Sequence, residues 1–164
     1  MDELIKFPNL ERVLMEFGEE LKDQYQKNLV KNDRVATRNL LNSVEVVLKK
    51  GTSTYTVSLN LADYWIYVEN GRGPTKSSGN GELRRAILNW IKAKPVLPHP
   101  DKNGNLPTPQ QLAYLISRKI HRVGTEGTHD LRNATEDIYG KFKERIYEAI
   151  EKDVDEALIK IFLY

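Results

Sequence analysis

The residues of this chain best suited to metal chemistry are three histidines, because the sequence contains no cysteine and so no cysteine-built zinc site. His121 and His129 are separated by a glycine-containing turn, and Asp130 follows directly. A zinc site needs a third or fourth ligand at a workable spacing, and none is evident. We therefore expect no metal and no cofactor, and surface roles for His99, His121 and His129.

Two carboxylates, Asp63 and Glu69, lie on one expected short helix and are candidates for an acid–base pair. Their spacing would direct them to different faces of that helix, whereas general acid–base catalysis needs groups that converge. We expect Glu69 to make a structural hydrogen bond near the helix end instead.

The segment Gly73–Ser77 invites comparison with a phosphate-binding loop. The Walker pattern needs a glycine directly before the lysine and another five positions before that one, and these places hold Thr75 and Asn70. No nucleophile elbow, Ser/His/Asp trio or dinucleotide fingerprint is present either. The sequence therefore disfavours an enzyme. A small hydrolase with a site assembled only in three dimensions stays open, and its candidate groups are Asp63, Glu69, His121, His129 and Asp130.

The charges of the chain are unevenly distributed although the net charge is only +2. Residues 71–129 hold 10 Lys and Arg against 3 Asp and Glu, whereas residues 1–31 hold 5 against 7 and residues 130–164 hold 6 against 9. A basic middle is therefore bracketed by acidic ends. It faces nucleic acid, meets the acidic end of a neighbouring copy, or is a solvated face without a partner.

The basic residues that could form a contact surface lie in two expected helices within this middle segment. Aromatic side chains at 64, 65 and 67 could supply stacking on nucleic acid, although aromatics at helical spacing are more often core residues. The residues we expect to contact a subunit or partner are Arg84, Arg85, Arg118, Lys119 and Arg122.

The elements that must position these residues follow from apolar periodicity. We expect a long helix over 7–30, weakly interrupted at Gly18, and a β-hairpin over 43–61, where apolar and polar residues alternate. A loop-rich helical middle spans 62–128, with a short helix or a third strand at 62–71 and loops at 72–81 and 95–107. In the last helix, over 130–164, the apolar residues expected to form one stripe are Leu131, Ala134, Ile138, Phe142, Ile146, Ile150, Val154 and Leu158.

These elements predict an α+β fold in which a small antiparallel sheet, built on the hairpin, packs against long N- and C-terminal helices. A chain of 164 residues fits a single domain. The acidic N-terminus and the lack of an apolar run long enough to span a bilayer predict no signal peptide and no membrane association.

Three segments, in this order, resemble the tail-completion or neck (head–tail connector, minor tail) protein family of tailed double-stranded DNA bacteriophages. Residues 37–44 are similar to its Thr-Gly-x-Leu-x-x-Ser-Ile entry into the hairpin, and residues 64–72 to its Tyr-x-x-Tyr-Val-Glu-x-Gly signature. Residues 118–134 are similar to its Arg-Lys-Ile, Gly-Thr-x-Gly-Thr and Leu-Arg-x-Ala series. The motif positions are Thr37, Leu40, Ser43, Tyr64, Tyr67, Val68, Glu69 and Gly71.

The resemblance spans about Arg34–Asp137 and implies a structural virion protein without enzymatic activity. Its partners would be copies of itself in a ring at the head–tail neck, the portal-side connector and the tail-tube proteins. DNA in the lumen of the ring would lie nearby. The alternative from the residues themselves is a DNA-binding accessory protein that uses the basic segment 71–129.

Overall fold

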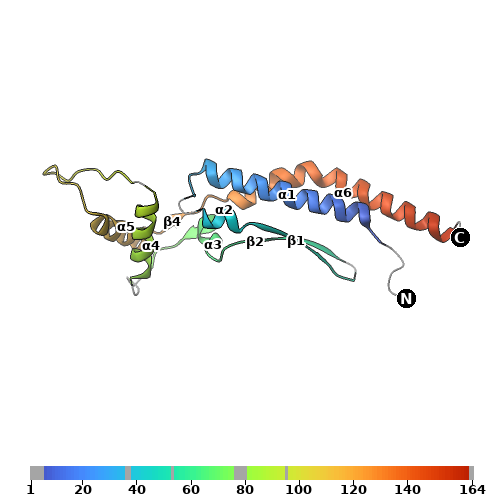
Figure 1. The fold of residues 1–164 in the computed structure, drawn as a ribbon, viewed down its shortest axis with the longest axis horizontal. Helices are drawn as coiled ribbons and strands as arrows, with labels where there is room; N and C mark the ends of the chain where they lie inside the picture. Colours follow the sequence, from blue (N-terminus) through green and yellow to red (C-terminus); the bar gives the residue numbers. More distant parts are fainter. Residues whose placement is uncertain (1–5, 36–37, 53, 76–80, 95, 163–164) are drawn as a thin grey trace.

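The computed structural model describes residues 6–35, 38–52, 54–75, 81–94 and 96–162. Their elements form an elongated molecule whose two long helices lie side by side (Figure 1). The predicted α+β class, with a two-stranded antiparallel hairpin and long terminal helices, is confirmed. The elements are α1 (Pro8–Lys31), α2 (Asn39–Ser43), β1 (Glu45–Lys50), β2 (Tyr55–Asn60), α3 (Trp65–Asn70), β3 (Gly71–Arg72), α4 (Glu82–Ala93), α5 (Pro109–Val123), β4 (Thr125–Glu126) and α6 (Asp130–Phe162).

Helices α1 and α6 form an antiparallel pair that contains most of the main core. Each helix contributes apolar residues three or four positions apart, which lie on one helix face. Phe17 and Phe142 meet edge to face across the pair, with 5.7 Å between their ring centroids. The apolar faces predicted at the two ends of the sequence therefore pack against each other.

The buried stripe of α6 departs from the prediction beyond Phe142. A helix turns 3.6 residues per turn, so a strict four-residue repeat drifts by about 40° at each step and leaves the buried face. The residues buried farther along are Ala149, Asp153 and Ala157, whereas Val154 and Leu158 are exposed and Ile150 is half-buried. The expectation of one continuous stripe is therefore wrong for the second half of α6.

The hairpin β1–β2 lies against α1, and its register pairs Val46 with Leu59 and Leu48 with Val57. Gly18 permits this approach, because a Cβ at that position would lie 3.1 Å from the Val57 side chain and still closer to that of Val46. Helix α1 is continuous through Gly18. The expected interruption there is wrong, and the glycine serves packing instead.

Helices α4 and α5 pack on each other around a second, smaller hydrophobic cluster centred on Ile87, Ile91 and Ala113. We call α4, α5 and residues 96–108 between them the head, and α1, α2, α3, β1, β2 and α6 the body. The head lies at one end of the molecule (Figure 1). Whether these two clusters behave as the single domain predicted from chain length stays a prediction.

A two-stranded ribbon, β3 paired with β4, connects head and body, and the sequence did not predict it. Gly71 pairs with Glu126, and Arg72, expected in a loop, pairs with Thr125. The short helix α3 directly precedes β3, so the helix expected at 62–71 is confirmed and the rival third strand is replaced by these two ribbon residues. No helix among the described residues is long and apolar enough to cross a membrane.

Candidate functional site

The junction between head and body brings two of the motif segments together in space. The carbonyl of Val68 accepts hydrogen bonds from the Thr128 backbone N–H at 3.1 Å and from its hydroxyl at 3.3 Å. The Glu69 carbonyl accepts from the His129 N–H at 3.1 Å. Residues 68–72 therefore align with residues 125–132, and the ribbon continues this alignment toward the head.

The side chain of Glu69 is buried and caps the start of α6. Its carboxylate accepts hydrogen bonds from the backbone N–H groups of Leu131 at 2.9 Å and Arg132 at 3.0 Å. These donors belong to the first turn of a helix, where N–H groups lack intrahelical partners and a negative charge is favourable. The structural role expected for Glu69 is confirmed, and the helix end concerned is that of α6. Asp63 is exposed, so the two carboxylates sit in different environments.

Asp130 is buried at the first position of α6 and is fully engaged in hydrogen bonds. Its carboxylate accepts from the Asn32 side chain and from the Thr128 hydroxyl. Its backbone carbonyl accepts from the Asn28 side chain at 3.0 Å. Asp130 thus holds the end of α1 against the start of α6. This structural role differs from the metal-ligand role that its position next to His129 brought into consideration.

Tyr25 of α1 is completely buried in the body, and its hydroxyl has no hydrogen-bond partner among the described residues. Burial raises the pKa of this hydroxyl well above its usual range, and the nearby carboxylates of Glu69 and Asp130 add to the effect. A buried phenol beside two carboxylates is a group that sequence reasoning missed, because its position follows only from the helix pairing.

At three glycine positions in and beside the ribbon there is no room for a side chain. Gly71 and Gly124 have φ angles of 74° and 77°, a region that favours glycine. A Cβ on Gly71, Gly124 or Gly127 would collide with backbone atoms of the opposite strand or of the segment before it. The Gly-Thr-x-Gly spacing is therefore explained by backbone-to-backbone contact at the junction.

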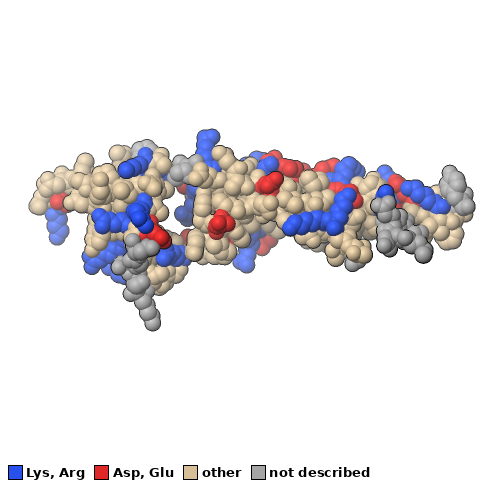
Figure 2. Space-filling view, turned by 60° about the horizontal axis from the view of Figure 1, so that its bottom comes forward, with Lys and Arg blue, Asp and Glu red and all other residues tan. Residues whose placement is uncertain are grey.

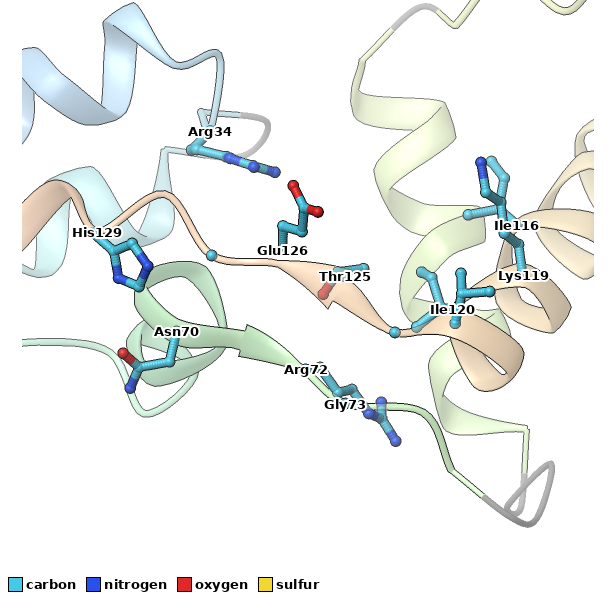
Figure 3. A pocket seen from close by; sticks show the side chains of 13 residues that line it. Arg34, Asn70, Arg72, Gly73, Ile116, Lys119, Ile120, Thr125, Glu126 and His129 are labelled. Carbon is cyan, nitrogen blue, oxygen red and sulfur yellow. The ribbon is translucent and has the colours of Figure 1, made fainter.

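An open cavity of about 1090 Å³ lies beside the ribbon, between head and body. Arg34 from the body and Glu126 from β4 extend toward each other there, whereas Arg72 points in a different direction (Figure 3). Lys119 lines the α5 side. The described lining residues contribute charge but present no nucleophile with a base beside it.

His121 and His129 lie at or near this junction, whereas His99 lies in the head, in the segment between α4 and α5. His121 shares a hydrogen bond through Nδ1 with the Thr75 hydroxyl, and its carbonyl accepts from the Thr75 N–H at 2.9 Å. His129 has a φ of 53° and lies at the cavity. Within the described ranges, no group of three His, Asp or Glu side chains is arranged to hold a metal ion. Lys76 and Ser77 of the loop compared with a phosphate site fall outside the described residues.

All five basic residues expected to make contacts are exposed on the head. The Arg84 guanidinium lies over the Tyr114 ring at 5.6 Å, which joins α4 to α5. Lysine and arginine atoms predominate over the head in Figure 2, whereas both charge types mix over the body. Lys94, directly after α4, forms an ion pair within the chain with Asp33 just beyond the end of α1.

The remaining motif positions have structural or surface roles. Leu40 is buried, and the Ser43 hydroxyl donates to the Leu40 carbonyl at 2.8 Å and accepts from the Ala62 N–H at 3.0 Å. Tyr64 and Tyr67 are exposed, whereas Trp65 between them packs against the core. Thr37 falls outside the described residues.

Sequence reasoning also missed an exposed apolar strip on the second half of α6, because the four-residue repeat placed three of its members, Ile150, Val154 and Leu158, in the core stripe. The strip comprises Tyr147, Ile150, Val154, Leu158 and Ile161, of which Ile150 is half-buried and the others are exposed.

Comparison of the chain with models of protein families, with curated proteins and with solved structures found no match.

Proposed function

We propose that this chain is a non-catalytic structural subunit of a tailed-phage virion. It forms a homomeric ring at the head–tail interface, between the portal-side connector and the tail tube. The observation that carries the proposal is the structural role of Glu69 and Asp130. Both carboxylates, available in principle to a hydrolase, are buried and engaged in joining α3, α1 and α6.

The shape and surface of the molecule support the same proposal. The motif segments build a ribbon of close backbone contacts, and the ribbon connects a basic head to a mixed-charge body. Large surfaces without convergent reactive groups are what an assembly subunit needs, since its work is to contact copies of itself and neighbouring proteins.

A DNA-binding accessory protein is the second candidate, and the exposed cations of α4 and α5 favour it. Binding to the phosphate backbone releases counterions, so affinity for duplex DNA would fall steeply as salt rises. A lack of duplex binding at low salt eliminates this candidate.

Two measurements test the proposed function directly. The mass of the purified assembly at high protein concentration reports whether copies associate. A tagged chain, expressed during infection by the phage that encodes it, should be found in assembled particles at the neck. A tagged chain that stays out of purified virions contradicts the proposal, whatever its behaviour in isolation.

A further inference from the structure

The exposed strip of α6 is an apolar face with a negatively charged edge. Its residues are three or four positions apart, so they share one face of the helix. Tyr147 is 58% exposed and Leu158 is 45% exposed. Apolar side chains repeated in this way over four turns are typical of a helix face that packs against another helix.

The acidic edge runs alongside the strip. Glu148, Glu151 and Asp155 each directly follow a strip residue and lie about 100° farther around the helix than that residue, and Glu144 lies one turn before Glu148 on the same side. Residues 144–156 contain six Asp and Glu against two Lys and Arg. The edge consists of Glu144, Glu148, Glu151 and Asp155, none of which forms an ion pair with another described residue.

The outer face of α5 has the complementary character. Leu115, Arg118 and Arg122 lie three and four positions apart and are exposed, and Leu115, which is 53% exposed, is not part of the head cluster. Tyr114 and Lys119 border them. Residues 108–123 contain no Asp or Glu. This is a basic helix face with an apolar residue at its centre.

These two faces lie at opposite ends of the elongated molecule, so they do not meet within one chain (Figure 1). We propose that the outer face of α5 of one copy docks on the α6 strip and acidic edge of a second copy. The proposal rests on the proposed function and assigns the surfaces through which the subunits associate.

The charge and the apolar area of the two faces together favour a second copy of this chain as the partner that binds the α6 strip. The cations of α5 match the unpaired carboxylates of the α6 edge, and the strip offers Leu115 an apolar surface. Duplex DNA would match the cations but would leave the strip uncovered. Because the two faces differ, the contact is heterologous, and successive copies close into a ring where the rotation permits.

The test uses two variants of the full chain that each disable one face without creating a new charge match. The head-blocked variant is Leu115→Ser/Arg118→Gln/Arg122→Gln, and the strip-blocked variant is Glu151→Gln/Asp155→Asn/Leu158→Ser. Sedimentation velocity at low and high salt reports self-association. A matched control, Glu136→Gln/Lys141→Gln, neutralises exposed α6 charges outside the strip.

We expect each blocked variant to lose self-association by about tenfold or more relative to wild type and to the control. Mixed together, the two variants should form a one-to-one pair and nothing larger, because one native face of each kind remains. Far-ultraviolet circular dichroism melts of all variants should coincide with wild type, which separates docking from folding.

Three results would overturn the inference. Wild-type chain that stays monomeric at every concentration and salt removes the contact, although a tagged chain found in virions would still support the proposed function. A head-blocked variant that still dimerises while the strip-blocked one does not indicates a symmetric α6–α6 contact. Loss of duplex binding in the head-blocked variant, without any self-association, assigns the α5 face to DNA.

Discussion

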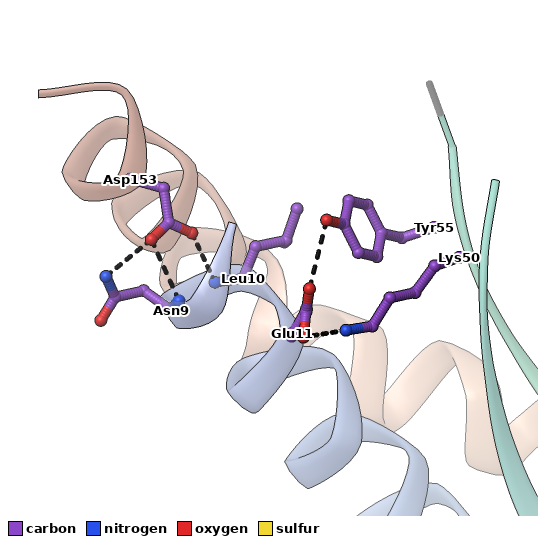
Figure 4. A network of polar contacts seen from close by, with 6 residues as sticks. All are labelled: Asn9, Leu10, Glu11, Lys50, Tyr55 and Asp153. Carbon is purple, nitrogen blue, oxygen red and sulfur yellow. Dashed lines mark hydrogen bonds and ion pairs between the residues drawn. The ribbon is translucent and has the colours of Figure 1, made fainter. Parts of the chain in front are cut away.

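The buried carboxylate of Asp153 in α6 accepts a 2.8 Å hydrogen bond from the backbone N–H of Leu10 at the start of α1 (Figure 4). The same carboxylate also accepts from the backbone and side chain of Asn9, at 3.0 and 2.7 Å. Glu69 does the same for α6 at the other end of the body. The antiparallel helix pair is thus fixed at both ends by a buried acid from another element that caps a helix start.

Replacing Asp153 should destabilise the monomer. Asp153→Ala leaves the buried N–H group of Leu10 and the half-buried one of Asn9 without an acceptor, so we expect the free energy of unfolding to fall by about 1–3 kcal/mol. Asp155→Ala, an exposed acid two positions along, is the control and should change stability little. Chemical denaturation monitored by circular dichroism measures both, and equal effects of the two variants would argue against the cap.

Replacement of Glu69 and replacement of Asp63 should differ sharply in their effect on the free energy of unfolding. Glu69→Ala uncaps the first turn of α6 and should lower the free energy of unfolding by about 1–3 kcal/mol. Asp63→Ala, at an exposed position, should leave it nearly unchanged. Thermal melts give the comparison. A Glu69→Ala protein of wild-type stability that has lost a measurable hydrolytic turnover would instead revive the enzyme hypothesis.

Two helical glycines should respond to alanine with opposite signs. At exposed Gly140 in α6 a Cβ meets nothing within 4 Å, so Gly140→Ala should stabilise by about 1 kcal/mol through helix propensity. At Gly18 the added Cβ meets Val46 and Val57, so Gly18→Ala should destabilise despite the same propensity gain. Denaturation midpoints of the two variants test this, and stabilisation by both would mean that the hairpin does not press on α1.

The buried hydroxyl of Tyr25 should make stability depend on alkaline pH. Burial raises the pKa of Tyr25 above its ordinary value of 10.0, so in this alkaline range the unfolded chain loses the proton first. The contribution of Tyr25 to stability is therefore constant below about pH 10 and falls as the pH rises above it. Tyr25→Phe should reduce this alkaline loss and, having no unpaired hydroxyl to bury, should be at least as stable as wild type at neutral pH. Unfolding measured against pH checks both, and an unchanged alkaline slope would contradict the assignment.

Local pattern was sufficient for much of the fold. The alternation around Val46 and Val57 predicted the hairpin and its buried face, and the apolar spacing of α1 and the first half of α6 predicted two amphipathic helices. Helix α5 likewise begins and ends at local signals, since Thr108 before it forms a capping box with Gln111 and Gly124 follows its last residue. Each of these features depends on residues close together in the sequence, which is why pattern alone reaches them.

The candidate site was less accessible from the sequence. The exposed cations of α4 and α5 were predicted, but Ile150, Val154 and Leu158, which belong to the α6 strip that we pair with α5, were assigned to the core stripe. The resemblance placed residues 64–72 and 118–134 in one order without saying that they touch. The ribbon β3–β4 joins them through Arg72 and Thr125, and the cap from Glu69 joins them across 62 residues of chain.

The sequence by itself determined the long helices and the hairpin, the apolar face of α1 and of the first half of α6, and that the middle of the chain is basic. Tertiary structure alone decided which apolar face is covered, that Gly18 receives the hairpin, and that Asp153 and Glu69 cap helices far away in the chain. The physical reason is that periodicity records the character of a face and not its partner. A partner is chosen by long-range packing, in which backbone approach, helix drift and buried polar groups must be satisfied together.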